Sequence, residues 1–184
     1  MIYYHGTPAG GLRFLEPGKP EHFDRPARVY LTTLYPMALL YGVKNYEYTY
    51  GFTAQKQIYF SEYFPNALEI LYRGKSASVY TCAPENPQPG RIPHEFVSEQ
   101  TVKIVEEIRI PDVCEELLKQ ERLGNLVIQR YDRLTQPELA WIRKVEKEGI
   151  IQSGLLERKD PMAVYYRTHY PDSWEDAQKE QALV

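Results

Sequence analysis

The segment VYLTTLYPMALLYG, Val29–Gly42, predicts a β-strand that leads directly into an α-helix. Its first residues are β-branched, aromatic or aliphatic, which is typical of a strand. Pro36 suits the first turn of a helix, where its missing N–H group is not needed, and Gly42 is a typical helix end. The strand holds Tyr30 and the helix holds Tyr41, eleven residues later. The predicted fold and the predicted site both depend on this unit.

Strands and loops are predicted on both sides of this unit. Proline and glycine mark the loops, and β-branched and aromatic runs mark the strands. The region 46–63 is rich in aromatic residues but has no clear period, so no element is assigned there. Strands are expected at residues 2–5, 76–82, 95–100 and 102–110, a short helix or bend at 12–17, a helix at 65–74, and loops at 16–28 and 83–93.

The chain becomes helical after Pro111. Capping-box spacing occurs at Asp112–Glu115 and at Thr135–Glu138, and each pair precedes a helical pattern. The second of these helices is expected to end at Gly149, and the polar C-terminus is expected to fray. We therefore expect an α+β core over residues 1–111 and a helical extension over residues 112–184, within one compact unit.

Composition and charge exclude several protein classes. Hydrophobic residues make up 43% of the 184 residues and charged residues 26%, which is ordinary globular usage. No apolar run is long enough to cross a membrane and no secretion signal is present, so we expect a cytoplasmic protein without a membrane partner. The net charge of -3 gives no support to general nucleic-acid binding. Cys82 and Cys114 lack disulfide or metal-ligand spacing, so no metal site is predicted.

Three short segments together carry a functional motif. A His-Gly pair lies on the first strand, two tyrosines lie on the following strand and helix, and a glutamate opens a later strand. In this order they resemble the ADP-ribosyltransferase superfamily of the diphtheria-toxin and poly(ADP-ribose) polymerase type, which has a His-Tyr-Glu triad. The resemblance covers residues 1–111 and implies a split antiparallel β-sheet core. The matching residues are His5, Gly6, Tyr30, Tyr41 and Glu95.

The resemblance implies an enzyme that uses NAD as its donor substrate. A mono-ADP-ribosyltransferase of this type releases nicotinamide and transfers ADP-ribose to a macromolecular acceptor, for example as a toxin or defence effector. The acceptor remains open among protein, nucleic acid and small molecule. An inhibitory protein partner at the C-terminal helices is a further open interpretation. The alternatives are an NAD glycohydrolase and an inactive module that binds an NAD-like ligand or a protein.

The resemblance also assigns roles to the matching residues. The catalytic set is Glu95, His5 and Tyr30, with the carboxylate stabilising positive charge on the nicotinamide ribose. Tyr30 and Tyr41 would sandwich the nicotinamide ring. His5 would donate a hydrogen bond to the adenosine ribose, and the backbone of Gly6 would meet the carboxamide.

Two further residues complete the predicted NAD-binding set. For the carboxamide donor and for the catalytic acid, the sequence offers alternative residues. The set includes Thr7 and Arg25, and Lys19 and Arg28 are further candidates for the pyrophosphate. Family members often carry a serine where this chain has Ala38, so Thr32, Thr33 or a water molecule are the alternative donors to the carboxamide. The alternatives to Glu95 as the catalytic acid are Glu99 and the pair Glu106 and Glu107.

Overall fold

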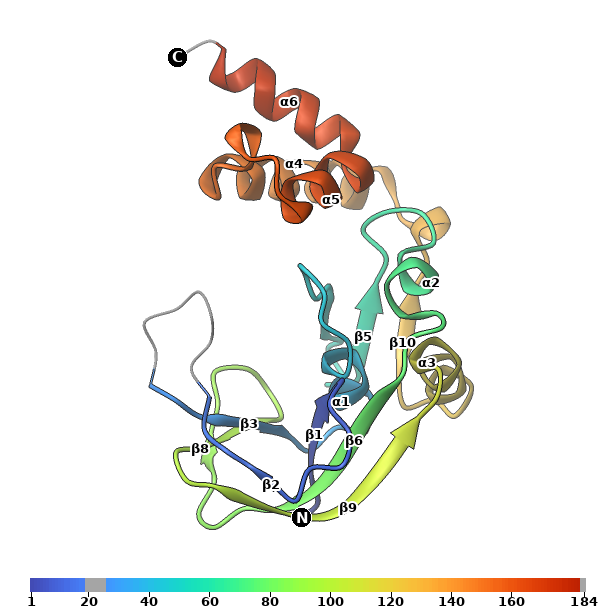
Figure 1. Ribbon diagram of the computed structural model, residues 1–184. Helices are drawn as coiled ribbons and strands as arrows, with labels where there is room; N and C mark the ends of the chain where they lie inside the picture. The colour runs from blue at the N-terminus through green and yellow to red at the C-terminus, as the bar shows by residue number, and fades with distance from the viewer. Residues whose placement is uncertain (19–25, 183–184) are drawn as a thin grey trace. The chain divides into compact units, whose positions relative to one another are not determined.

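A computed structural model describes residues 1–18 and 26–182 of the chain (Figure 1). The chain forms two compact units, unit 1 over Met1–Tyr59 and Leu68–Val127, and unit 2 over Phe60–Ala67 and Ile128–Val184. The chain therefore does not divide after Pro111, and the expectation of one compact unit is not met. The reason is helix α3 (Val113–Arg122), which buries apolar residues in unit 1 and contacts helix α1.

Unit 1 is built on a seven-stranded sheet whose neighbouring strands all pair antiparallel. The chain is thus an α+β protein, as predicted. The strand order is β2-β9-β6-β1-β3-β8-β7. The strands are β1 (Tyr3–Thr7), β2 (Phe14–Leu15), β3 (Val29–Thr32), β6 (Ala77–Ala83), β7 (Gln88–Pro89), β8 (Glu95–Ser98) and β9 (Val102–Ile110).

The sheet opens between its central strand, β1, and the neighbouring strand β3. Strand β1 pairs with β6 along all five of its residues, but its register with β3 consists of one position, Tyr4 opposite Thr32. His5 and Gly6 therefore lie where β1 and β3 separate. The cavity described below lies beside this opening.

The predicted strand and helix of Val29–Gly42 are confirmed. Helix α1 (Tyr35–Tyr41) follows β3, has a proline in its first turn and is capped by Gly42. Its residues from Pro36 to Leu40 are buried, and the helix packs on β1 and against α3. The packing explains why a short helix is stable here, since isolated helices of this length do not persist in water.

Several short elements were not predicted correctly. Residues 14–15 form a strand instead of a helix or bend, and residues 88–89 form a strand inside the expected loop. The unassigned region 46–63 contains β4 (Tyr50–Phe52) and β5 (Ile58–Ser61), which join β10 (Val127–Gln129) in a three-stranded sheet of order β10-β5-β4. Strands this short depend on a distant pairing partner, so a local pattern does not reveal them. Helix α2 (Ala67–Tyr72) lies within the predicted helix at 65–74.

Unit 2 is helical and has its own apolar core. Its elements are η1 (Tyr131–Arg133), α4 (Gln136–Gln152), η2 (Leu155–Glu157), α5 (Pro161–His169) and α6 (Pro171–Gln181). The capping box at Thr135–Glu138 is confirmed, but α4 continues past Gly149 to Gln152. The continuation buries Ile150 in the core, and this packing outweighs the low helix propensity of one glycine.

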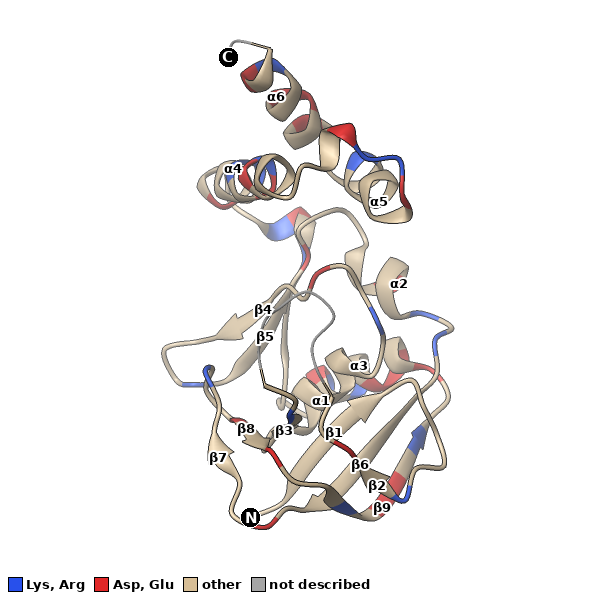
Figure 2. Cartoon of the chain, turned by 60° about the vertical axis from the view of Figure 1, so that its left-hand side comes forward, with Lys and Arg blue, Asp and Glu red and all other residues tan. Residues whose placement is uncertain are grey.

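The C-terminal helix is ordered, in contrast to the expected fraying. Trp174 and Ala177 are buried in the core of unit 2. Ion pairs join α4 to α6, between Arg143 and Asp176 at 2.6 Å and between Lys147 and Glu180 at 2.6 Å. Figure 2 shows basic and acidic positions along both helices. The polar residues that suggested fraying therefore form the outer side of an amphipathic helix.

Other sequence predictions concern the cysteines and the membrane. Cys82 and Cys114 are both free and buried, as predicted. Across residues 1–18 and 26–182, none of the helices combines the length and apolar composition needed to span a bilayer. The same residues contain no group of three or more His, Cys, Asp or Glu side chains placed to hold a metal ion.

Candidate functional site

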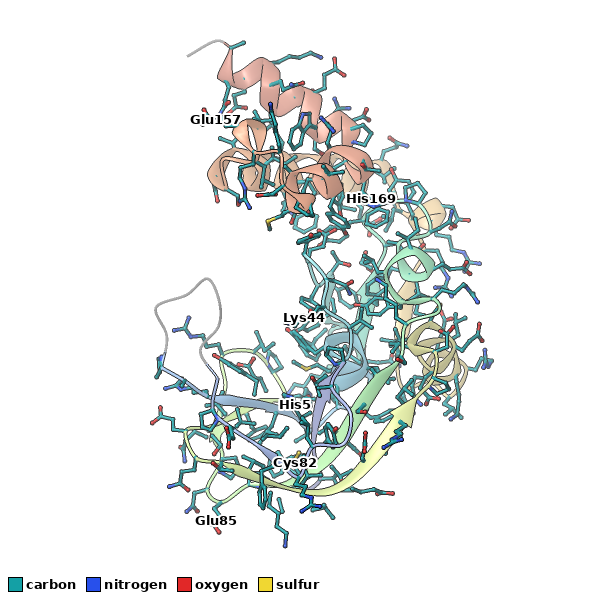
Figure 3. The ribbon with its side chains drawn as sticks, viewed as in Figure 1. His5, Lys44, Cys82, Glu85, Glu157 and His169 are labelled. Carbon is teal, nitrogen blue, oxygen red and sulfur yellow. The ribbon has the colours of Figure 1, made fainter. Side chains whose placement is uncertain are left out.

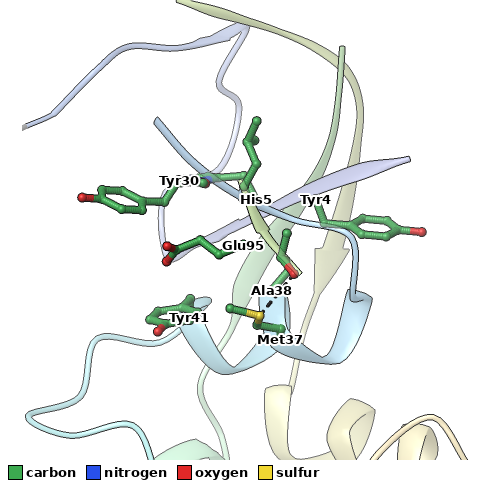
Figure 4. Close-up of a pocket in the computed structure, with 10 residues that line it drawn as sticks. Tyr4, His5, Tyr30, Met37, Ala38, Tyr41 and Glu95 are labelled. Atoms are coloured by element: carbon green, nitrogen blue, oxygen red, sulfur yellow. Dashed lines mark hydrogen bonds between the residues drawn. The ribbon is translucent and has the colours of Figure 1, made fainter. Parts of the chain in front are cut away.

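A cavity of about 350 Å³ lies in unit 1 beside the opening between β1 and β3 (Figure 4). Its volume falls in the range of small-molecule sites, and its lining is largely apolar with a few polar groups. Four elements contribute to it, namely β1, β3, α1 and β8; Figure 3 shows His5 on the first of these. Five of the predicted site residues line it together, namely His5, Gly6, Tyr30, Tyr41 and Glu95.

Strand register explains why Tyr30 and Glu95 reach the same cavity. In the pairing of β3 with β8, Glu95 lies opposite Thr32 and Val97 lies opposite Tyr30. Paired residues of an antiparallel sheet share a face, and so do residues two apart along a strand. Tyr30 and Glu95 are therefore diagonal neighbours on one face. A register shift of one residue would move the Glu95 carboxylate to the other face.

A tight turn before β8 holds the Glu95 carboxylate. The backbone N–H of Arg91 donates to Glu95 Oε1 at 2.8 Å, and the N–H of Gly90 donates to the Glu95 carbonyl at 2.8 Å. A Cβ atom at Gly90 would lie 2.7 Å from the Glu95 carboxyl carbon, so this position must be glycine for the carboxylate to keep its place. The carboxylate is thus positioned by its own loop before any ligand binds.

His94, immediately before Glu95, has left-handed backbone geometry, with φ of 64°. This conformation is unfavourable for a residue with a side chain, so the surroundings must hold it. Thr33 does so, because its N–H donates to the His94 carbonyl at 3.1 Å and its hydroxyl is hydrogen-bonded to His94 Nδ1 at 3.1 Å. The link ties the start of β8 to the end of β3. His94 therefore helps to position Glu95.

The surroundings of Glu95 differ from those of the three other glutamates that were candidates for the catalytic acid. Glu99 forms an exposed ion pair with Arg28 at 2.8 Å. Glu107 accepts hydrogen bonds from the Ser78 hydroxyl at 2.7 Å and from the Gly11 N–H at 3.1 Å. Glu106 is an exposed residue of β9. Of these four acids, Glu95 is the one that lines the cavity.

His5 connects the two strands at the point where they separate. Its Nδ1–H group donates to the Tyr30 carbonyl oxygen at 2.8 Å. Burial lowers the pKa of His5 below its ordinary value, and the hydrogen bond to Tyr30 opposes this only in part. The ring is therefore neutral at pH 7, and because Nδ1 carries the proton, Nε2 is left as a hydrogen-bond acceptor. In place of the predicted donation to a ribose hydroxyl, this geometry favours acceptance from one.

The lowered pKa of His5 predicts a loss of stability in acid. Between pH 6.5, the ordinary value for histidine, and the lower folded pKa, the unfolded chain binds more protons than the folded chain, so stability falls as the pH drops across this interval and levels off below it. We expect His5→Asn, whose amide can also donate to Tyr30, to reduce the decrease in melting temperature between pH 7 and pH 5. Burial also lowers the pKa of His169, so part of the decrease should remain. An unchanged decrease in His5→Asn would contradict the assignment of a neutral, buried His5.

Tyr30 and Tyr41 lie on either side of the Glu95 carboxylate in Figure 4. The hydroxyl of Tyr41 is hydrogen-bonded to the hydroxyl of Tyr50 at 2.9 Å, and its ring lies 4.6 Å from the ring of Tyr48. Burial raises the pKa of Tyr41, and the nearby charge of Glu95 adds to the increase. Both effects keep the phenol neutral, and the contacts with Tyr50 and Tyr48 hold its ring.

Gly6 and Ala38 are in direct contact through the backbone. A Cβ atom at Gly6 would overlap the carbonyl oxygen of Ala38 and lie 2.7 Å from its carbonyl carbon. The absence of a side chain at Gly6 is thus required for α1 to pack on β1, whatever ligand the cavity takes. The alternative donors near Ala38 are already engaged, since the Thr32 hydroxyl donates to Met37 Sδ at 3.2 Å and the Thr33 hydroxyl binds His94.

A second cavity of about 560 Å³ shares His5 and Tyr30 with the first. Arg13, Phe14 and Arg28 also line it. Arg13 and Phe14 were missed in the sequence, because only the pairing of β2 with β9 brings them to this position. Arg28 is ion-paired with Glu99, and Glu16 also lines this cavity. Arg13 therefore supplies the cation that, beside the exposed ring of Phe14, suits an anionic ligand carrying an aromatic base.

Among the predicted residues that the structure describes, Thr7 lines neither cavity. Thr7 ends β1, and its hydroxyl accepts a hydrogen bond from the Ala9 N–H at 3.2 Å. Its predicted role in NAD binding therefore has no support from the cavity linings. Arg25 and Lys19 lie outside the described residues.

Comparison of the chain with protein-family models gives no match, and no curated protein matches its sequence. Any functional assignment therefore depends on the geometry of the two cavities and on the motif resemblance.

Proposed function

We propose that this protein is an ADP-ribosyltransferase that cleaves NAD, releases nicotinamide and transfers ADP-ribose to an acceptor. One observation carries the proposal: His5, Tyr30, Tyr41 and Glu95, from four separate elements, line a single cavity. Each residue type alone is common. Their convergence in the order and spacing of a His-Tyr-Glu motif supports the resemblance on independent geometric grounds.

The two adjoining cavities suit the two halves of NAD. In this proposal the nicotinamide ring lies between Tyr30 and Tyr41 in the first cavity, where aromatic faces bind a flat ring. The adenosine diphosphate half extends past His5 into the second cavity, toward Arg13 and Arg28. The neutral His5 ring accepts a hydrogen bond from a ribose hydroxyl at the boundary between them.

Glu95 supplies the charge that the reaction needs. Cleavage of the glycosidic bond gives its electron pair to the nicotinamide nitrogen and leaves positive charge on the ribose. A carboxylate already fixed by the Arg91 N–H stabilises this charge without reorganising. The apolar lining of the cavity strengthens the interaction, because fewer water molecules screen it. Glu95 can then accept the proton that the acceptor loses.

Incubation of the protein with NAD labelled in its ADP-ribose part, with and without a cell lysate, tests the proposal. Nicotinamide release together with label on a macromolecule is the expected result. Nicotinamide release with free ADP-ribose alone, in every condition, would indicate an NAD glycohydrolase. The absence of nicotinamide release in all conditions would overturn the proposal.

Arg13 provides a prediction about the second cavity. If its guanidinium binds the pyrophosphate, Arg13→Ala should raise the KM for NAD roughly tenfold and change kcat little, since one exposed charge-assisted hydrogen bond is lost. Steady-state nicotinamide release measures both constants. Arg109→Ala is the matched control, because Arg109 is 78% exposed on β9 and lines neither cavity. An unchanged KM in Arg13→Ala would place the pyrophosphate elsewhere.

A further inference from the structure

Four aromatic rings form a continuous row beside Glu95. The ring of Tyr41 lies 5.9 Å from that of Tyr50, Tyr50 lies 6.3 Å from Phe52, and Phe52 lies 5.7 Å from His94. We call these four residues the aromatic row. One end, Tyr41, lines the first cavity, and the other end, His94, directly precedes Glu95 in the chain.

The aromatic row lies close to the Glu95 carboxylate not only at its ends but also at Tyr50, one of its inner members. The charge of Glu95 contributes to the raised pKa of both Tyr41 and Tyr50, after the larger effect of burial. Tyr50 and Phe52 lie two residues apart on β4, so their side chains share a face. This strand is at the edge of its sheet. An acceptor that approaches Glu95 along β4 would therefore meet aromatic rings.

Three basic residues flank the aromatic row. Lys44 follows α1 (Figure 3), Lys56 lies in the turn between β4 and β5, and Arg91 lies in the turn before Glu95. All three are exposed, and within residues 1–18 and 26–182 none of them forms an ion pair. Residues 41–57 contain two lysines and one glutamate, so this segment is locally basic in an acidic chain.

We propose that the aromatic row binds a base of a single-stranded nucleic acid, and that this base is the acceptor of ADP-ribose. Bases stack on aromatic side chains, and exposed cations attract the phosphates between them. A protein acceptor would not require this combination of rings and unpaired cations. The inference rests on the proposed function, because it names the acceptor class of the same site.

The transfer step balances without a further reactant. The bond between C1′ of the ribose and the nicotinamide nitrogen breaks, and its electron pair neutralises the nicotinamide. A nitrogen or oxygen of the base donates an electron pair to C1′. The proton lost by the base passes to the Glu95 carboxylate and then to water. The products are nicotinamide and an ADP-ribosylated base.

Binding and transfer are tested separately, with the full chain. Fluorescence anisotropy with labelled single-stranded homopolymer DNA and RNA should show binding that weakens as salt increases. Phe52→Ala should weaken it at least about fivefold, and Phe52→Trp should retain it, since stacking is lost in one and kept in the other. Ile70→Ala is the control, because Ile70 is 48% exposed on α2 and lies outside the aromatic row. Thermal unfolding checks that each variant is folded.

Labelled NAD then separates this inference from the proposed function. Label on one or more of the oligonucleotides, reduced in Phe52→Ala, is the expected result. Nicotinamide release with label on lysate proteins, and none on any oligonucleotide, would overturn the inference and leave the proposed function in place. A wild-type protein that binds no homopolymer at low salt would also overturn it. A protein that never releases nicotinamide would overturn both.

Discussion

Replacement of Glu95 by glutamine is expected to lower the rate of nicotinamide release from NAD by about 100- to 1000-fold, equivalent to about 3 to 4 kcal/mol of barrier. The amide has the size of the carboxylate but lacks its charge, so it does not stabilise positive charge on the ribose. Its oxygen can still accept the hydrogen bond from the Arg91 N–H. We therefore expect the fold to persist, with a melting temperature close to that of the wild type.

Glu106→Gln is the matched control for this experiment. It makes the same chemical change at an exposed acid on β9 that does not line the cavity. Initial rates at saturating NAD should be similar in this variant and in the wild type. Wild-type nicotinamide release by Glu95→Gln would show that Glu95 is not the catalytic acid, and so would an equal loss in both variants.

The second large effect is expected on stability, from Gly6→Ala. The added Cβ atom would overlap the Ala38 carbonyl and lie 3.0 Å from the backbone nitrogen of Gly42. Both atoms belong to backbone, which cannot rotate away as a flexible side chain can, so α1 must move off β1. We expect the free energy of unfolding to fall by about 3 kcal/mol or more, at the upper end of overpacking effects. Domains have about 5–15 kcal/mol of stability, so this loss is a large fraction.

Urea unfolding followed by circular dichroism measures the effect. Gly18→Ala is the control in the same unit, because a Cβ atom there would meet no atom of residues 1–18 and 26–182 within 4 Å. Its unfolding midpoint should stay near that of the wild type. If Gly6→Ala unfolds at the wild-type midpoint, α1 does not depend on close contact between Gly6 and the Ala38 carbonyl to pack on β1.

Local sequence patterns predicted the elements that carry local signals. The β-branched and aromatic residues, Pro36 and Gly42 were sufficient to predict β3 and α1, because strand-forming composition and helix-end residues are properties of neighbouring residues. The capping box at Thr135–Glu138 was found in the same way. Gly149 misled, because whether a helix continues through one glycine depends on what its next turn buries.

The candidate residues of the first cavity, and their convergence on one site, were predicted from the motif resemblance, but no local pattern shows how the chain brings them together. His5, Tyr30, Tyr41 and Glu95 were selected by motif order, and four acids competed for one role. The pairing of Thr32 with Glu95 selects among these acids, because it places Glu95 beside the cavity, whereas Glu99 pairs with Arg28. Register between distant strands is a property of the packed sheet, so no local pattern encodes it.

The sequence by itself determined an α+β chain with a strand-helix unit at Val29–Gly42 and the motif residues of the candidate site. Only the tertiary structure decided the division into two units, the second cavity with Arg13, the packing reason for Gly6, and the aromatic row on β4. Each of these depends on contacts between residues far apart in the chain. Such contacts form when short strands and helices bury apolar surface together, and the free energy of that burial belongs to the assembled unit and not to any one segment.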